Sequence, residues 1–157
     1  MHRNVEAVIE AGRRIGIDVR PREFTQSTRT AAEAADAIGV ELGQIVKSLV
    51  FTVDDQPVLA LVGGDRLVDE HKLSLAAGGM MSRRPDADRV RAVTGFPVGG
   101  VPPFGHLSAM AVFVDEGLLA YDEVWAAAGT PHVNFPVDPR QLAEATAGSV
   151  VDVGRKP

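Results

Sequence analysis

The chain has no cysteine among its 157 residues. This absence excludes a disulfide framework, a thiolate metal site and a cysteine nucleophile, so Ser, Thr, Lys, His and carboxylate side chains remain for any chemistry. Histidine is scarce as well, with four residues and no H-x-x-x-H spacing. We therefore expect no bound metal.

Long apolar runs and an excess of positive charge are also absent. No run approaches the ~20 residues of a membrane span, and the start MHRNVEAVIEAGRR lacks the apolar region of a signal peptide. We expect a cytoplasmic protein without a membrane partner. The net charge of −5 argues against an extended nucleic-acid footprint, although a single local contact with a phosphate stays open.

The composition that is present is ordinary for a folded protein. Hydrophobic residues make up 45% of the chain and charged residues 24%, with no block of like charges. At this length we expect one domain over residues 1–157, large enough to bury a core.

Helices and strands are predicted in mixed order. Thr30 and Glu33 form a capping box and Gly39 a helix stop, and similar start and stop residues mark the other helices. Helices are expected at residues 4–16, 27–40, 69–79, 85–95 and 138–148, with a helical turn at 120–129. Strands are expected at residues 45–53, 57–65, 110–118, 132–137 and 149–153, with a weak edge strand at 18–24.

The links between these elements narrow the class further. The polar trio at 54–56 predicts a hairpin between two strands, whereas residues 80–85 fit no single element. No strict βαβ repeat occurs, and no glycine-rich phosphate loop precedes a helix. Both observations weaken a Rossmann or P-loop interpretation.

The strand IVKSLVFTV, residues 45–53, contains an unexpected lysine. Because side chains alternate along a strand, Lys47 shares a face with the apolar residues Ile45, Leu49, Phe51 and Val53. The ammonium could reach the surface or pair with a carboxylate, for which Asp65 is available. Alternatively, it lines a cavity and waits for an anionic ligand or has a depressed pKa, and periodicity leaves both interpretations open.

The second unusual stretch is TGFPVGGVPPFGH, residues 94–106. Prolines fix φ and remove N–H donors, while glycines let another molecule approach the backbone closely. Such a stiff loop can hold a carbonyl or carboxylate by its amides, or it can simply connect two elements.

Four stretches together resemble the YbaK-like family of aminoacyl-tRNA deacylases. They are TRTAAEAADAIGVELGQIVKSLVF, LALVGGDRLVDEHKL, TGFPVGGVPPFGH and AGTPHVNFPVDPRQLAEATAG. The family includes the editing domain of bacterial prolyl-tRNA synthetases and free-standing relatives, and the resemblance covers nearly the whole chain. The strand lysine and the Gly99–Gly105 loop are its most specific elements.

The resemblance implies an α/β fold in which a mixed sheet curls into a partly open barrel with helices around it. It implies trans-editing, the hydrolysis of the ester of a mischarged tRNA, without metal or cofactor. Lys47 would be the essential side chain and bind the phosphates of the terminal nucleotide, while the loop backbone holds the aminoacyl group. Water or a substrate group would attack, assisted by the terminal ribose hydroxyl.

The candidate catalytic residue is therefore Lys47. Histidines without metal-ligand partners are often structural, so a structural role is the alternative for two of the substrate-binding candidates, His106 and His132. The candidates for substrate binding are Gly99, Gly100, Val101, Pro102, Pro103, Phe104, Gly105, Asp65, His106, His132 and Thr28. The pair at 83–84 is expected to be a solvated surface pair or a tRNA contact.

The implied partner is the acceptor end of a mischarged tRNA. Because each neutralised phosphate adds affinity and the chain is acidic, binding should be confined to that end, or a synthetase should deliver the tRNA. The alternative is a non-catalytic YbaK-like module that binds an acyl or nucleotide ligand. Hydrolysis assays with mischarged tRNAs separate the two.

Overall fold

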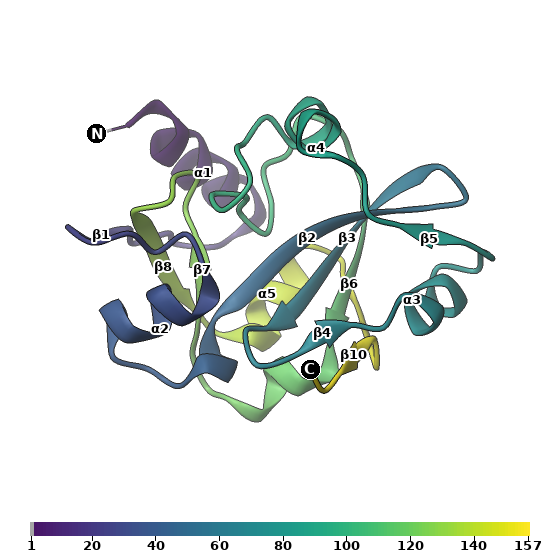
Figure 1. Ribbon diagram of the computed structural model, residues 1–157. Helices are drawn as coiled ribbons and strands as arrows, with labels where there is room; N and C mark the ends of the chain where they lie inside the picture. The colour runs from purple at the N-terminus through teal and green to yellow at the C-terminus, as the bar shows by residue number, and fades with distance from the viewer. Residues whose placement is uncertain (1) are drawn as a thin grey trace.

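The computed structural model describes residues 2–157, which form five α-helices and three β-sheets (Figure 1). The helices are α1 (Arg3–Ile15), α2 (Ala31–Ile38), α3 (Glu70–Ala76), α4 (Ala87–Thr94) and α5 (Pro139–Ala145). The longer strands are β2 (Val46–Val53), β3 (Gln56–Gly63), β6 (Ala111–Asp115), β7 (Val124–Ala127) and β8 (Val133–Val137). The shorter strands are β1 (Arg22–Glu23), β4 (Leu67–Val68), β5 (Ser82–Arg83), β9 (Ser149–Val151) and β10 (Gly154–Arg155). Two 3-10 turns, η1 (Leu42–Gln44) and η2 (Glu116–Ala120), complete the mixed α/β chain.

The helix ends follow the capping residues in the sequence. Thr30 and Glu33 form the predicted capping box of α2, and Gly39 ends this helix with φ 85°. Asp138 caps α5, whose first residue is Pro139. These helices therefore begin and end where local side-chain chemistry places them. None of the helices in the described residues has the length and apolar character needed to cross a bilayer.

The largest sheet has the strand order β5-β2-β3-β6-β9. Its centre is the antiparallel β2–β3 hairpin, which confirms the predicted hairpin. The two turn residues Asp54 and Asp55 have φ 49° and 66°, as a type I′ turn requires. Strands β6 and β9 join in parallel, and β5 pairs with the far end of β2.

The predicted partly open barrel is wrong, because the described sheets stay separate. Strands β1, β8 and β7 form a second sheet, and β4 pairs with β10 in a third. Between β2 and the second sheet, residues 2–157 contain a single bridge, which joins Ile45 to Trp125. A barrel needs continuous pairing around its circumference, and these two sheets part after that bridge.

The segment 120–129, expected to be a helical turn, contains strand β7 instead. Its alanines favour a helix, but burial of Val124 and Ala126 in the core with β8 alongside overrides that local preference. Residues 80–85, which fitted no single element, contain β5. The weak edge strand at 18–24 is confirmed as β1, at the edge of its sheet.

The two faces of the large sheet pack into different cores. Val46 and Val50 belong to the main core, together with α1, α5 and the second sheet. Phe51 and Val53 pack on the opposite face, against Leu73 of α3. Alternation along β2 therefore sends neighbouring residues to opposite sides, as the sequence predicts.

Candidate active site

A hollow of about 320 Å³ lies where β2 parts from β7, and we call it the β2–β7 hollow. This volume is in the range of small-ligand sites. Its apolar lining includes Ala31, Ala34, Ile45, Val46, Leu49, Val98, Val101 and Ala127. Its remaining lining residues are Thr28, Arg29, Thr30, Lys47, Ser48, Gly99 and Asn134. Segments far apart in the sequence thus form one concave surface.

The structure brings four predicted site residues to this hollow: Thr28, Lys47, Gly99 and Val101. They come from the segment before α2, from β2 and from the glycine/proline loop. The strand lysine and the loop, which the sequence singled out separately, therefore line the same hollow.

Lys47 is half-buried and also borders a second hollow of about 280 Å³, which we call the Arg84 groove. The groove is lined by Lys47, Leu49, Phe51, Leu67, Val68, Glu70, Arg84 and Arg155. Three of these side chains are cationic and one is anionic. Lys47 thus joins a mainly apolar hollow to a groove with excess positive charge.

The Lys47 ammonium donates a hydrogen bond to the carbonyl oxygen of Arg66, in the turn after β3. Burial lowers the pKa of Lys47; the Asp65 carboxylate opposes this shift and Arg84 adds to it. Among residues 2–157, the Asp65 carboxylate forms no ion pair with Lys47 within 4 Å, so it influences the lysine only at longer range. The ammonium therefore has a neutral partner and keeps donors for an anion.

The Arg66 turn is itself held by a buried carboxylate. Asp115 is 1% exposed, and its Oδ2 lies 3.5 Å from the Arg66 Nε. Asp115 also accepts backbone bonds from Gly117, Val153 and Gly154 at 2.9–3.2 Å. The carbonyl that positions Lys47 thus belongs to a turn fixed from the protein interior.

The first half of the glycine/proline loop lines the β2–β7 hollow. Gly99 has φ 89°, which favours glycine, and a Cβ there would lie 2.5 Å from the Arg29 Cγ. Gly100 donates its N–H to the Pro97 carbonyl at 3.0 Å, and its Cα faces the backbone of Gly129. In residues 2–157 the amides of Val98, Gly99 and Val101 donate to no other group, so these three N–H groups of lining residues remain as donors for a ligand.

The second half of the loop packs into the protein. Pro102 and Pro103 are buried, and Phe104 packs edge-to-face on Phe135 at 5.8 Å. The His106 Nε2 lies 2.7 Å from the Pro102 carbonyl oxygen, and burial lowers the pKa of this histidine. Gly105 has φ 82° and lies against Ala11. These residues fix the loop rather than line the β2–β7 hollow.

Two further candidates lie elsewhere. His132 is exposed, with its Nδ1 3.2 Å from the Gln26 carbonyl oxygen, and borders a different hollow with His2 and Glu23. Asp65 is exposed beside Gly43 and is linked to Lys47 only by its charge. The structure places neither in the lining of the β2–β7 hollow.

The lining residues that were not predicted include the polar residues Arg29, Ser48 and Asn134. Asn134 is 3% exposed and donates to Thr28 Oγ1 at 2.6 Å, and Thr28 donates to the Pro131 carbonyl at 2.8 Å. A polar residue inside the apolar strand 132–137 was the available signal for Asn134. Ser48 gave a similar signal beside Lys47.

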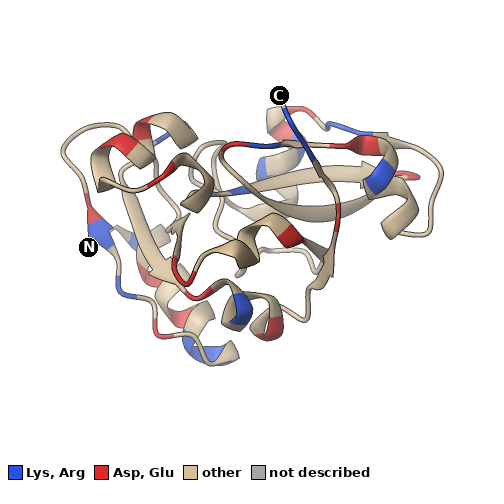
Figure 2. Cartoon of the chain, turned by 90° about the horizontal axis from the view of Figure 1, so that it is seen from below, with Lys and Arg blue, Asp and Glu red and all other residues tan. Residues whose placement is uncertain are grey.

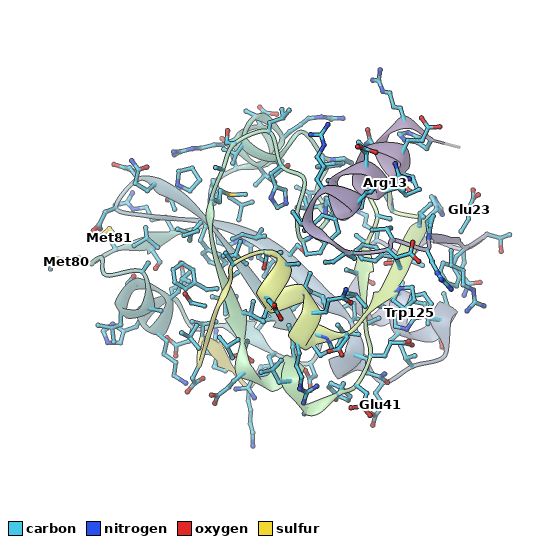
Figure 3. The ribbon with its side chains drawn as sticks, turned by 180° about the vertical axis from the view of Figure 1, so that it is seen from behind. Arg13, Glu23, Glu41, Met80, Met81 and Trp125 are labelled. Carbon is cyan, nitrogen blue, oxygen red and sulfur yellow. The ribbon has the colours of Figure 1, made fainter. Side chains whose placement is uncertain are left out.

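Among residues 2–157, no three or more His, Asp or Glu side chains come together in a way that could hold an ion. The exposed Met80 and Met81 lie at the other end of the molecule from Trp125, which bridges to the start of β2 (Figure 3).

Comparison with known proteins places this site in a family. Residues 25–145 match the family model described as "Aminoacyl-tRNA editing domain". The chain belongs to this family. The match contains α2, β2, the glycine/proline loop and β8, and thus the whole lining of the β2–β7 hollow.

Individual relatives agree with the family match. "Uncharacterized protein YwhH" of Bacillus subtilis is 35% identical over 133 residues, which are 83% of this chain and 84% of the relative. "Putative Cys-tRNA(Pro)/Cys-tRNA(Cys) deacylase EbsC" of Enterococcus faecalis is 27% identical, covering 85% and 82% of the two chains. A "Proline--tRNA ligase" of Maridesulfovibrio salexigens is 38% identical over 69% of this chain, which spans 19% of that enzyme.

A solved structure agrees over the whole fold. The crystal structure of "a putative trans-editing enzyme for prolyl tRNA synthetase" superposes with a TM-score of 0.92 and 41% identity, covering 99% of each chain. The editing-domain fold therefore extends beyond the matched segment to both ends of the chain.

Proposed function

We propose that the protein is an aminoacyl-tRNA deacylase that hydrolyses the ester of a mischarged tRNA in trans. The observation that carries the proposal is the position of Lys47, between the β2–β7 hollow and the Arg84 groove. An aminoacyl group in the hollow and nucleotide phosphates in the groove would meet at this ammonium. Family membership and the deacylase and trans-editing names of relatives support the same activity.

The chemistry needs positioning and charge stabilisation rather than a protein nucleophile. Water attacks the ester carbonyl carbon, or a group on the substrate attacks it first and water then opens the cyclic product, with the terminal ribose hydroxyl assisting. The bond from that carbon to the ribose oxygen breaks, and hydrolysis releases the amino acid and a tRNA with a free terminal hydroxyl. Lys47 holds the phosphates, and the amides of Gly99 and Val101 stabilise negative charge on the carbonyl oxygen.

The tRNA partner would be held mainly at its acceptor end. The net charge is −5, and Figure 2 shows Lys and Arg segments interspersed with Asp and Glu segments rather than collected on one side. Few phosphates can be neutralised by such a surface, so Lys47, Arg84 and Arg155 would supply the local contacts. A synthetase partner that delivers the tRNA would supply the remaining affinity.

A panel of mischarged tRNAs tests the proposal. Wild-type protein is expected to hydrolyse at least one aminoacyl ester well above the uncatalysed rate, with activity retained after exhaustive chelation. Lys47→Met is expected to abolish it, and Lys72→Met, which removes a partly exposed lysine of α3 that pairs with Asp152 outside both hollows, serves as the control. Binding of the panel without hydrolysis of any member would contradict the proposal and favour a binding module.

A further inference from the structure

The free edge of β2 is turned toward the β2–β7 hollow. Beyond the bridge of Ile45 to Trp125, no strand in residues 2–157 pairs with this edge until β5 reaches Thr52. Gly64 donates its N–H to the Ile45 carbonyl oxygen at 2.8 Å. This bond shows which alternate residues along the strand direct their backbone N–H and C=O groups to β3. Residues 45, 47 and 49 therefore direct their backbone groups to β3, and Ser48 directs its N–H and C=O away from β3.

The Ser48 side chain adds a third polar group at the same point. Its Oγ is buried and has no hydrogen-bond partner in residues 2–157. A buried hydroxyl without a partner is costly, and a ligand that pairs with it removes that cost. Backbone register and side-chain burial are independent observations, and both leave Ser48 without partners in the lining of this hollow.

The three groups of Ser48 match an α-amino acid ester. A residue at a strand edge pairs with the N–H and C=O of one facing residue, and an α-aminoacyl group carries an amine and a carbonyl at that same spacing. The β2–β7 hollow has no carboxylate in its lining, so backbone and hydroxyl oxygens and the Asn134 amide oxygen are its acceptors for an amine.

We propose that Ser48 recognises the α-amino group of the aminoacyl ester, which binds as a one-residue extension of the sheet. The Ser48 C=O accepts from the amine, while the Ser48 N–H donates to the ester carbonyl. The Oγ, which is closed to solvent in the unliganded protein, also accepts from the amine once the side chain rotates about χ1 toward the hollow. This role rests on the proposed function, and it makes Ser48 a specificity residue for α-amino acid esters over simple acyl esters.

The experiment compares an aminoacyl-tRNA that the protein hydrolyses with the same tRNA carrying the matching deamino acyl group. Each kcat/KM is divided by the uncatalysed rate of that ester, because the amine itself activates the carbonyl. Wild type is expected to prefer the amino ester by about ten- to a hundredfold in corrected kcat/KM, because the free energy of hydrogen bonds to a charged group corresponds to a ratio of about that size. Ser48→Ala, which keeps the backbone groups, is expected to reduce this preference by roughly three- to tenfold.

Thr52→Val is the matched control, because it removes a hydroxyl from the same side of β2 outside the β2–β7 hollow. It is expected to leave the preference unchanged, and urea unfolding checks that both variants fold. Equal corrected rates for the two esters with wild type, or an equal loss for both with Ser48→Ala, would overturn the role of Ser48 and leave the deacylase intact. Absence of hydrolysis with every aminoacyl ester would overturn both.

Discussion

Replacement of Lys47 by methionine separates stability from activity. Methionine keeps the length and flexibility of the side chain and removes the charge. Burial lowers the pKa of Lys47, so the charged form is less stable in the folded protein than in the unfolded chain. This cost is fully present below the folded pKa and fades as pH rises through it toward the ordinary value of 10.5.

The expected change in stability is small. The variant loses the bond from Lys47 to the Arg66 carbonyl, worth about 1 kcal/mol, and gains from the removal of a half-solvated charge. We expect the free energy of unfolding at pH 7 to change by less than about 1 kcal/mol, with stabilisation the favoured direction. Any gain should shrink in alkaline buffer.

The expected change in activity is large. Loss of one partner of a desolvated charge pair with phosphate costs roughly 2–5 kcal/mol, which corresponds to about a 30- to 4000-fold fall in kcat/KM. Lys47→Arg should also be impaired, because a planar guanidinium does not take the place of a compact ammonium. Single-turnover deacylation and urea unfolding of the same preparations measure both effects.

Two results would refute this reasoning. Wild-type turnover by Lys47→Met would show that the ammonium does not bind the reacting substrate. Parallel loss of stability and activity would show a structural role. Lys72→Met keeps the same net charge as Lys47→Met and corrects for general charge effects on tRNA binding.

Three further predictions concern the support of the site. Gly99→Ala should destabilise the protein by about 1 kcal/mol because of the positive φ of Gly99, and it should reduce the rate of deacylation. Gly100→Ala should mainly lower the melting temperature, because its Cβ would lie 3.0 Å from the Gly129 carbonyl oxygen. Equal rates for both variants and wild type would argue against loop amides in catalysis. Asp115→Asn should lower the free energy of unfolding by about 3–5 kcal/mol, because an amide cannot accept all the hydrogen bonds of the buried carboxylate. Urea unfolding measures this change, and a change below about 0.5 kcal/mol would contradict the prediction. Because the pKa of His106 is lowered in the folded protein, protonation of His106 opposes folding. The free energy of unfolding of wild type should therefore fall as the pH falls through 6.5, and that of His106→Gln should fall less. Identical pH dependence of unfolding in the two proteins would refute this role of His106.

The sequence predicted the parts of the fold that local chemistry determines. The capping box at Thr30 and the hairpin after residue 53 depend on neighbouring residues, and both appear as expected, although the turn takes two residues rather than the whole polar trio at 54–56. Strand β7 was mistaken for a helical turn because its burial depends on distant elements. The prediction of a partly open barrel was wrong for the same reason, since closure of a barrel depends on how two separate sheets meet.

The candidate site was predictable only in outline. Lys47 and the loop stood out because an apolar strand and a glycine/proline cluster make unusual residues visible. Which loop residues line the hollow could not be predicted, because the adjacent Gly99 and Gly100 are identical in chemistry and differ only in the direction that the folded backbone gives them. Arg29 likewise became part of the site only through the approach of its segment to the loop.

The β2–β3 hairpin connects the register of the sheet to the chemistry of the site. Lys47 and Ser48 are adjacent, so alternation sends one side chain toward the Arg84 groove and leaves the other on the opposite face of β2. A slip of one residue would exchange these faces and move the ammonium toward the main core. The type I′ turn at Asp54 and Asp55 opposes such a slip, because a two-residue loop permits one pairing of the flanking strands. The position of Lys47 is therefore set by a turn at the other end of its strand, outside the lining of the β2–β7 hollow.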